Sequence, residues 1–272
     1  MEETRIITSS RTNRRKLHLK KLWTYRSIIV AFVRRDIRAH YAQTRLGIVW
    51  SVVQALTAAA IIQVFFGVLL QVTIPGIPYI LYAFPGMMAW YFFSYIVNNS
   101  GTSLLQSQHL IKKVYFPKLV LPLYKSLVGL VELLVWMLVF AVLLLFFSYP
   151  IGLRLLLIPL CVLLNMIAGL SIAIWLSALT VRYRDMSHII PYLVGFGIFV
   201  TPVFFATTMI PNAYHFLVYF NPMAGVIELY RWSILGTGFS TAYLWGLIPC
   251  ILLLVSGLFY FRRVESTMAD LV

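Results

Sequence analysis

Long apolar segments alternate with short polar ones along most of the chain. Between residues 46 and 111 there is no Asp, Glu, Lys or Arg, and Pro75 and Pro78 exclude one continuous helix through this stretch. Because about 20 apolar residues suffice for a helix to cross a bilayer, the stretch holds two spans joined by a turn. The same pattern predicts six spans in all, at about residues 46–70, 85–105, 119–147, 153–181, 187–207 and 241–261.

One segment before the first span is amphipathic. Within residues 17–41, apolar residues recur at helical spacing and arginines occupy other positions. We expect a helix that lies in the membrane interface, with a generic basic anchor as the alternative. Its apolar positions are Leu22, Ile28, Ile29, Phe32, Val33 and Ile37.

Residues 210–236 are too apolar to face water, but each helical piece they contain is too short to cross. Pro211 and Asn212 start the first piece, and Asn221 starts the second as an N-cap with Pro222 behind it. Gly236 suits a helix end. The predicted fold is therefore an all-α integral membrane protein with six transmembrane helices, an N-terminal amphipathic interface helix and two short re-entrant helices on the outer side before the last span.

Basic residues predict the orientation of the spans. Of 22 Lys and Arg residues, twelve lie between Arg5 and Arg45, and eight more lie in or beside gaps on the same predicted side. The opposite side holds only Arg154 and Arg231. Since cytoplasmic loops carry an excess of Lys and Arg, we expect both termini of this multi-pass protein in the cytoplasm.

Composition agrees with this class and excludes a soluble protein. Hydrophobic residues make up 61% of the chain and charged residues 11%, against roughly 45–50% and about 25% in globular proteins. The net charge of +14 follows the predicted loops, so no nucleic acid is expected as a partner. Cys161 and Cys250 lie inside apolar runs and are predicted to be buried free thiols.

Few residues offer chemistry of their own. No glycine precedes a lysine, so there is no phosphate-binding loop of the G-x-x-x-x-G-K-[ST] type, and no paired metal-ligand motif occurs. Glu132 is the only ionisable residue deep in a predicted span. We favour a hydrogen bond to a neighbouring helix over an ion-coupling site. Glu228 and Arg231 are three residues apart, and we favour a structural ion pair over substrate contact.

Aromatic residues make up 15% of the chain and gather in two spans. Interfacial girdles explain some of them. The alternative is a pathway whose walls stack against the apolar C–H faces of sugar rings, and residues 98–103 add a polar stretch beside it. The candidate channel-lining aromatics are Trp90, Tyr91, Phe92, Tyr95, Phe196 and Phe199.

Four local motifs resemble one family in order and spacing over residues 20–265. That family is the ABC-2-type permeases that export lipid-linked polysaccharides such as O-antigen, capsule and teichoic acid. A basic extension, residues 1–16, and a tail, residues 266–272, lie outside the pattern. The motifs are Leu110–Pro117 with Leu121–Pro122; Arg34–Arg38 through Tyr41, Leu46 and Gly47; Arg184–Asp185 with Pro191 and Thr201–Phe204; and Asn221–Pro222 with Glu228, Tyr230 and Arg231.

The resemblance implies half of a transporter rather than an enzyme. Two copies would form a homodimeric channel for a lipid-linked polysaccharide in membrane lipid. Two copies of a separate cytoplasmic ABC ATPase would supply ATP hydrolysis with Mg, so no cofactor is expected in this chain. Residues 46–265 would be the transmembrane domain, 17–45 the interface helix, 108–117 the coupling helix and 210–236 the outer gate.

The resemblance also assigns candidate site residues. Coupling to the ATPase falls on His109, Lys112, Lys113, Val114, Tyr115, Phe116 and Pro117. The lipid headgroup would meet Arg34, Arg35, Arg38 and Arg45, and the outer gate would use Asn221, Pro222, Glu228, Tyr230 and Arg231.

Three alternatives differ in class. An ABC-2-type exporter of a small molecule or drug shares the architecture. A secondary transporter or channel would need no ATPase, and the sequence shows neither inverted halves nor coupling carboxylates. A membrane-embedded enzyme acting on lipid-linked sugars would need a pair of acids or a histidine–acid pair within the membrane, and in the sequence Glu132 stands alone.

Overall fold

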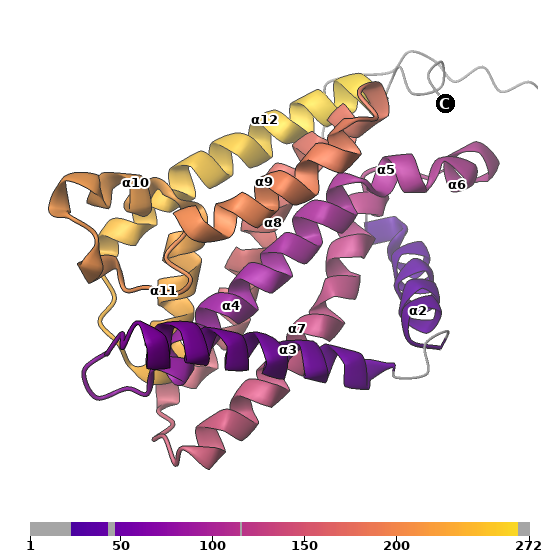
Figure 1. Cartoon of the computed structure of the whole chain (residues 1–272). Helices are drawn as coiled ribbons and strands as arrows, with labels where there is room; N and C mark the ends of the chain where they lie inside the picture. The colour runs from indigo at the N-terminus through magenta and orange to yellow at the C-terminus, as the bar shows by residue number, and fades with distance from the viewer. Residues whose placement is uncertain (1–22, 43–46, 115, 266–272) are drawn as a thin grey trace, which may run out of the picture.

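The computed structural model describes residues 23–42, 47–114 and 116–265, which form the helical bundle of Figure 1. Within these ranges the backbone forms helices and one isolated β-bridge between Ile74 and Ile77, without strands. The predicted extension 1–16, the tail 266–272, Arg45 and Tyr115 lie outside the described residues.

Five helices are long and apolar enough to cross a membrane, and they confirm five of the six predicted spans. Four of them include a segment of different pitch: α3 and α4 run on into π-helical turns, and α8 and α12 are each preceded by a 3₁₀ segment. The five are Ile48–Leu69 (α3 and η1), Tyr79–Ser100 (α4 and η2), Val120–Phe146 (α7), Leu153–Arg182 (η3 and α8) and Thr241–Glu265 (η6 and α12).

The predicted span 187–207 corresponds to a shorter helix, α9, which covers Met186–Val200. Its 15 residues rise about 22 Å, less than the roughly 30 Å of a hydrocarbon core. The chain leaves the helix at Thr201 because Pro202 disfavours a helical conformation in the residue before it. Residues 201–206 then form irregular, mostly buried backbone.

The second span starts earlier than the sequence predicts. Helix α4 begins at Tyr79, with Pro85 inside it, so the predicted start at residue 85 is wrong. A proline inside a helix removes a hydrogen bond to the carbonyl four residues earlier. Here the neighbouring carbonyl of Tyr82 accepts a hydrogen bond from Arg231, so the loosened turn is held from outside the helix.

Helix α4 is the centre of the bundle. In the most apolar part of this span 78% of the residues are buried, against 11% in the span that contains α3 and 22% in the span that contains α12. Helices α7, α8 and α11 (Pro222–Leu235) pack around it, as Figure 1 shows. A helix that is apolar on all sides belongs in such a position, whereas α3 keeps one apolar side free.

The amphipathic helix is present as α2, Arg26–Ala42, and lies against α7. Its apolar residues Ile29, Phe32, Val33 and Ile37 pack against the core. The ring of Phe32 lies 5.3 Å from that of Tyr124 on α7. The interface helix is thus attached to the bundle along its apolar face.

The segment before the last span folds into two short helices, α10 (His215–Phe220) and α11. The predicted cap is confirmed: Asn221 Oδ1 accepts a hydrogen bond from the Met223 amide at 3.0 Å. Gly236 ends α11 with φ 72°, a left-handed conformation that favours glycine. Helix α10 lies at the opposite end of the bundle from α6 (Gln108–Lys113) (Figure 1), and these two ends are called the α10 end and the α6 end below.

Candidate functional site: a cavity, a buried arginine and an exposed basic helix

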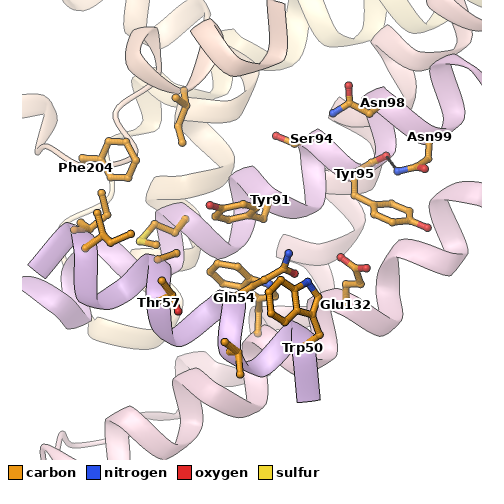
Figure 2. Close-up of a pocket in the computed structure, with 17 residues that line it drawn as sticks. Trp50, Gln54, Thr57, Tyr91, Ser94, Tyr95, Asn98, Asn99, Glu132 and Phe204 are labelled. Carbon is orange, nitrogen blue, oxygen red and sulfur yellow. Dashed lines mark hydrogen bonds between the residues drawn. The ribbon is translucent and has the colours of Figure 1, made fainter. Parts of the chain in front are cut away.

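A cavity of about 720 Å³ lies between α3, α4 and α7, with Ile198 of α9 and Phe204 at its margin. Figure 2 shows Trp50 and Gln54 of α3 and Glu132 of α7 among its lining residues, with Tyr91 of α4 above them. The volume is typical of sites that hold small organic ligands. The arrangement offers a polar and aromatic surface inside an otherwise apolar bundle.

The predicted aromatic wall divides into three groups. Tyr91 and Tyr95 line the cavity. Trp90 and Phe92 are buried in the core, 6% and 3% exposed, and do not line the cavity. Phe196 and Phe199 of α9 are exposed, at 70% and 69%, and do not line the cavity.

Sequence reasoning missed many of the lining residues, among them Trp136, Trp50 and Gln54. The ring of Trp136 on α7 stacks on that of Tyr91 at 4.4 Å, and Trp50 and Gln54 come from α3. Gln54 could have been recognised from the sequence as a lining residue, because it is a polar amide inside an apolar span. The polar stretch at the end of the second span did point here, because Asn98 and Asn99 line the cavity.

Glu132 has a partner that the sequence did not reveal. Oε1 of Glu132 lies 3.4 Å from Nε2 of His40, near the end of α2. This contact supports the predicted bond to a neighbouring helix, although the expectation that Glu132 stands alone is wrong. The carboxylate also faces the cavity, so it is both a packing contact and part of the lining.

Arg231 and Glu228 form a buried ion pair, as favoured from the sequence. Nη1 of Arg231 donates to Oε1 of Glu228 at 2.8 Å, and the two side chains are 0% and 8% exposed. The guanidinium also lies over the ring of Tyr82 at 4.0 Å. Both charges are held by α11 deep in the protein, where an unpaired charge would be costly.

The other two nitrogens of the Arg231 guanidinium donate hydrogen bonds to backbone carbonyl oxygens. Nε donates to the Tyr82 carbonyl of α4 at 3.2 Å, and Nη2 donates to the Val203 carbonyl at 2.6 Å. The hydroxyl of Tyr79 donates to the next carbonyl, that of Phe204, at 2.7 Å. Irregular backbone in an apolar interior requires such donors. Arg231 therefore joins α11, α4 and the irregular segment after α9.

The fit around this arginine is close. A methyl group on Gly86 of α4 would lie 2.6 Å from the Val203 carbonyl oxygen and 3.1 Å from Nη2 of Arg231. Only a residue without a side chain lets α4 approach the irregular segment so closely. Tyr230, also assigned to the gate, is fully buried. Three of the five predicted gate residues, Glu228, Tyr230 and Arg231, are therefore buried, whereas Asn221 and Pro222 are partly exposed.

At the α6 end, the predicted coupling segment, residues 108–117, begins with the short helix α6, after which Val114 is extended. A second short helix, α5 (Ser103–Gln106), precedes it. His109, Lys112, Lys113 and Val114 are exposed there. Phe116 is different: it is 6% exposed, and its ring packs edge-on against Phe32 of α2 at 5.7 Å. The exposed part of the segment is a basic surface, and Phe116 anchors it to the bundle.

The arginines of α2 divide between solvent and a local network. Arg34, Arg35 and Arg38 are exposed. Asp36 binds Arg35 at 2.8 Å and Lys125 of α7 at 2.9 Å. Burial raises the pKa of Asp36, but hydrogen bonds from Lys125 and Arg35 outweigh burial and hold the pKa below its ordinary value of 3.8. This network fixes α2 to α7 and leaves Arg34 and Arg38 available.

Comparisons with known proteins agree with this architecture. The chain is 27% identical over 251 residues to an O-antigen export system permease protein RfbA of Klebsiella pneumoniae, covering 90% of this chain and 95% of that protein. It is 26% identical over 215 residues to the protein of the same name from Myxococcus xanthus, with 78% and 82% covered. It is 25% identical over 252 residues to the polysialic acid transport protein KpsM of Escherichia coli, with 88% and 94% covered.

The model of one family, the ABC-2 type transporter, matches residues 28–235. The matched region begins in α2, contains the cavity and the exposed α6 segment, and ends with the last residue of α11. It covers three quarters of the chain. The chain is a member of the ABC-2 type transporter family.

Proposed function

We propose that this chain is the membrane permease half of an ATP-driven exporter that moves a lipid-linked polysaccharide out of the bacterial cytoplasm. The observation that carries the proposal is the match to O-antigen export permeases along 90% of this chain and 95% of theirs. The aromatic and polar cavity agrees with a glycan cargo. The chain works as a homodimer with two ATPase subunits, to which ATP and Mg bind.

In this proposal the chain crosses the inner membrane six times. Helix α9 rises about 22 Å, and the irregular residues 201–206 that follow it complete the crossing. The irregular part, 201–204, is buried in protein, as membrane-embedded irregular backbone must be. Helices α10 and α11 re-enter from the outer side.

The α6 end faces the cytoplasm. Lys112 and Lys113 of α6, Arg184 before α9 and Arg262 and Arg263 at the end of α12 all lie at this end of the bundle. Cytoplasmic loops carry such an excess of basic residues. Both termini and the docking surface for the ATPase then lie on the same side, and the α10 end forms the outer mouth.

Movement of the ATPase reaches the pathway through three contacts. Phe116, after α6, packs on Phe32 of α2, and the network of Asp36 and Lys125 joins α2 to α7. The Thr180 hydroxyl of α8 donates to the Gly101 carbonyl at 3.1 Å, just before α5. A displacement of α6 is therefore transmitted to α2, α7 and α8, which border or support the helices around the cavity.

Charge reversal of the exposed lysines tests the docking step. We expect Lys112→Glu with Lys113→Glu to abolish co-purification of the ATPase and the appearance of glycan on the cell surface. The matched control, Arg182→Glu with Arg184→Glu, changes the same charge in a different loop and retains both. Normal ATPase binding and surface glycan in the lysine variant at normal protein level would contradict the proposal.

A further inference from the structure

We propose that the cavity between α3, α4 and α7 is a charge-selective subsite for the glycan, which accepts neutral and N-acylated sugars and rejects acidic ones. The inference deepens the proposed function and rests on it. It concerns the class of sugar, and its basis is the polarity of the lining residues.

The polar lining lies at one end of the cavity. On α4 the lining residues follow each other at helical spacing from Met87 through Tyr91 and Tyr95 to Asn98 and Asn99. They become polar toward the α6 end. On α3, which runs the opposite way in Figure 1, the lining changes from Trp50 and Gln54 to Ile61 and Ile62. The two polar halves therefore meet at the α6 end of the cavity.

This polar end is rich in hydrogen-bond acceptors. Glu132 contributes a carboxylate, and Oδ1 of Asn98 is buried with no hydrogen-bond partner among the described residues. Nδ2 of Asn99 donates to the carbonyl of Tyr95 at 3.0 Å, which orients this amide (Figure 2). Free acceptors are satisfied by ligand donors, namely hydroxyl groups and acetamido N–H groups.

Cations are absent from the same surface. Among the seventeen residues that line the cavity, none is Lys or Arg. Lys125, two turns before Glu132 on α7, is bound to Asp36 at 2.9 Å. The group recorded beside Glu132 is His40, an imidazole at 3.4 Å that is itself 58% exposed. A sugar carboxylate placed here finds a carboxylate of the same charge and no arginine or lysine.

Aromatic side chains supply the walls for the sugar ring. Tyr91 stacks on Trp136 at 4.4 Å and is 45% exposed, and Trp50 is 52% exposed. A pyranose ring has apolar C–H faces that lie against such rings, while its equatorial hydroxyl groups point to the polar end. The sugar ring thus contacts the aromatic walls and its hydroxyl groups contact the polar end of the same cavity, as in other ligand sites.

Binding of one glycan in two charge states tests this directly. The probes are oligogalacturonate and its fully methyl-esterified form, which have the same backbone and differ in charge. They are titrated against the complete exporter in nanodiscs, with tryptophan fluorescence as the signal. We expect the neutral ester to bind at least about tenfold tighter than the acid, because the acid places like charges beside the carboxylate of Glu132.

Two variants localise the effect. Glu132→Gln keeps the shape and removes the charge, and we expect it to reduce the preference to about twofold or less. Gln54→Arg introduces a cation at the same end of the cavity and should reverse the preference. The control Asp185→Asn removes a carboxylate from the exposed start of α9 and leaves the preference unchanged.

The inference is overturned if the wild-type exporter binds both probes equally or neither, or if Glu132→Gln and Gln54→Arg leave the ratio unchanged. ATP-driven export of the cell's own lipid-linked glycan is measured on the same preparations. Export without discrimination between the probes refutes the charge-selective subsite alone. Failure of the wild-type complex to export any lipid-linked glycan refutes the proposed function itself.

Discussion

Arg231 is the residue whose loss should damage the protein most. Replacing it with methionine keeps the apolar stem and removes the guanidinium, which is fully buried and binds Glu228, Tyr82 and Val203. The change leaves a buried carboxylate without its cation and two buried carbonyls without a donor. Breaking a buried ion pair by removing one partner costs about 3–5 kcal/mol.

This loss of stability is large enough to be measured by thermal unfolding. For a chain of this size, 1 kcal/mol shifts the melting temperature by roughly 2–4 °C, so Arg231→Met should lower Tm by about 10 °C in nanodiscs. The matched control is Arg154→Met. Arg154 is exposed, makes one long hydrogen bond of 3.4 Å to Gly236 and lies 5.6 Å from the Trp232 ring, so its loss should cost less than about 1 kcal/mol.

A double variant separates charge from packing. Adding Glu228→Gln to Arg231→Met removes the unpaired carboxylate, and we expect it to restore part of the lost stability, with a coupling of about 1–3 kcal/mol. Arg231→Lys keeps the charge but loses the planar set of N–H donors. We expect its Tm to lie between those of the wild type and Arg231→Met. Equal Tm values for Arg231→Met and Arg154→Met would refute the assignment of Arg231 as the link between α11, α4 and the irregular segment.

Three further outcomes are expected. Gly86→Ala introduces a methyl group against a backbone carbonyl and should cost about 1–3 kcal/mol by thermal unfolding, whereas Gly195→Ala, which meets nothing within 4 Å, should not. Because the pKa of Asp36 lies below 3.8, its stabilisation is complete above about pH 4 and is lost as pH falls. Hydrogen exchange in α2 should therefore rise in acid, and Asp36→Asn should remove this dependence. Tyr91→Ala should slow export with little change in Tm, while Trp90→Ala should lower Tm.

Each of these has its own contrary result. A stable Gly86→Ala protein with unchanged Tm would show that α4 yields at this contact. Acid-dependent exchange in α2 that persists in Asp36→Asn would assign the effect to another group. Normal export by Tyr91→Ala, with slowed export and unchanged Tm in Trp90→Ala, would place the pathway on the other side of α4.

The apolar lengths and the polar breaks along the sequence were enough to predict five long helices within a few residues of their observed ends. The start of α4 was the exception, since a local rule for Pro85 could not include a donor from Arg231, which is 146 positions away in the chain. The early end of α9 could not be predicted either, because residues 201–204 are as apolar as a span. Their irregular backbone is tolerated in the interior because side chains from other helices donate to the buried carbonyls of Val203 and Phe204.

The site was predicted unevenly for a similar reason. The spacing of Glu228 and Arg231 on one helix indicated their pairing, but the partners Tyr82 and Val203 come from other elements. Aromatic residues were recognised by type, and periodicity did not tell which side of the helix faces the core. Trp90 and Tyr91 are adjacent in sequence, yet one is buried and the other lines the cavity.

In the proposed function the chain is a conduit driven by a separate ATPase. The most direct measurement is transport of a lipid-linked glycan in proteoliposomes that contain the purified chain with or without the ATPase that co-purifies with it. We expect glycan to reach the far side only when both proteins and hydrolysable ATP are present. Glycan movement by the chain alone, at the same rate without ATPase or nucleotide, would contradict it.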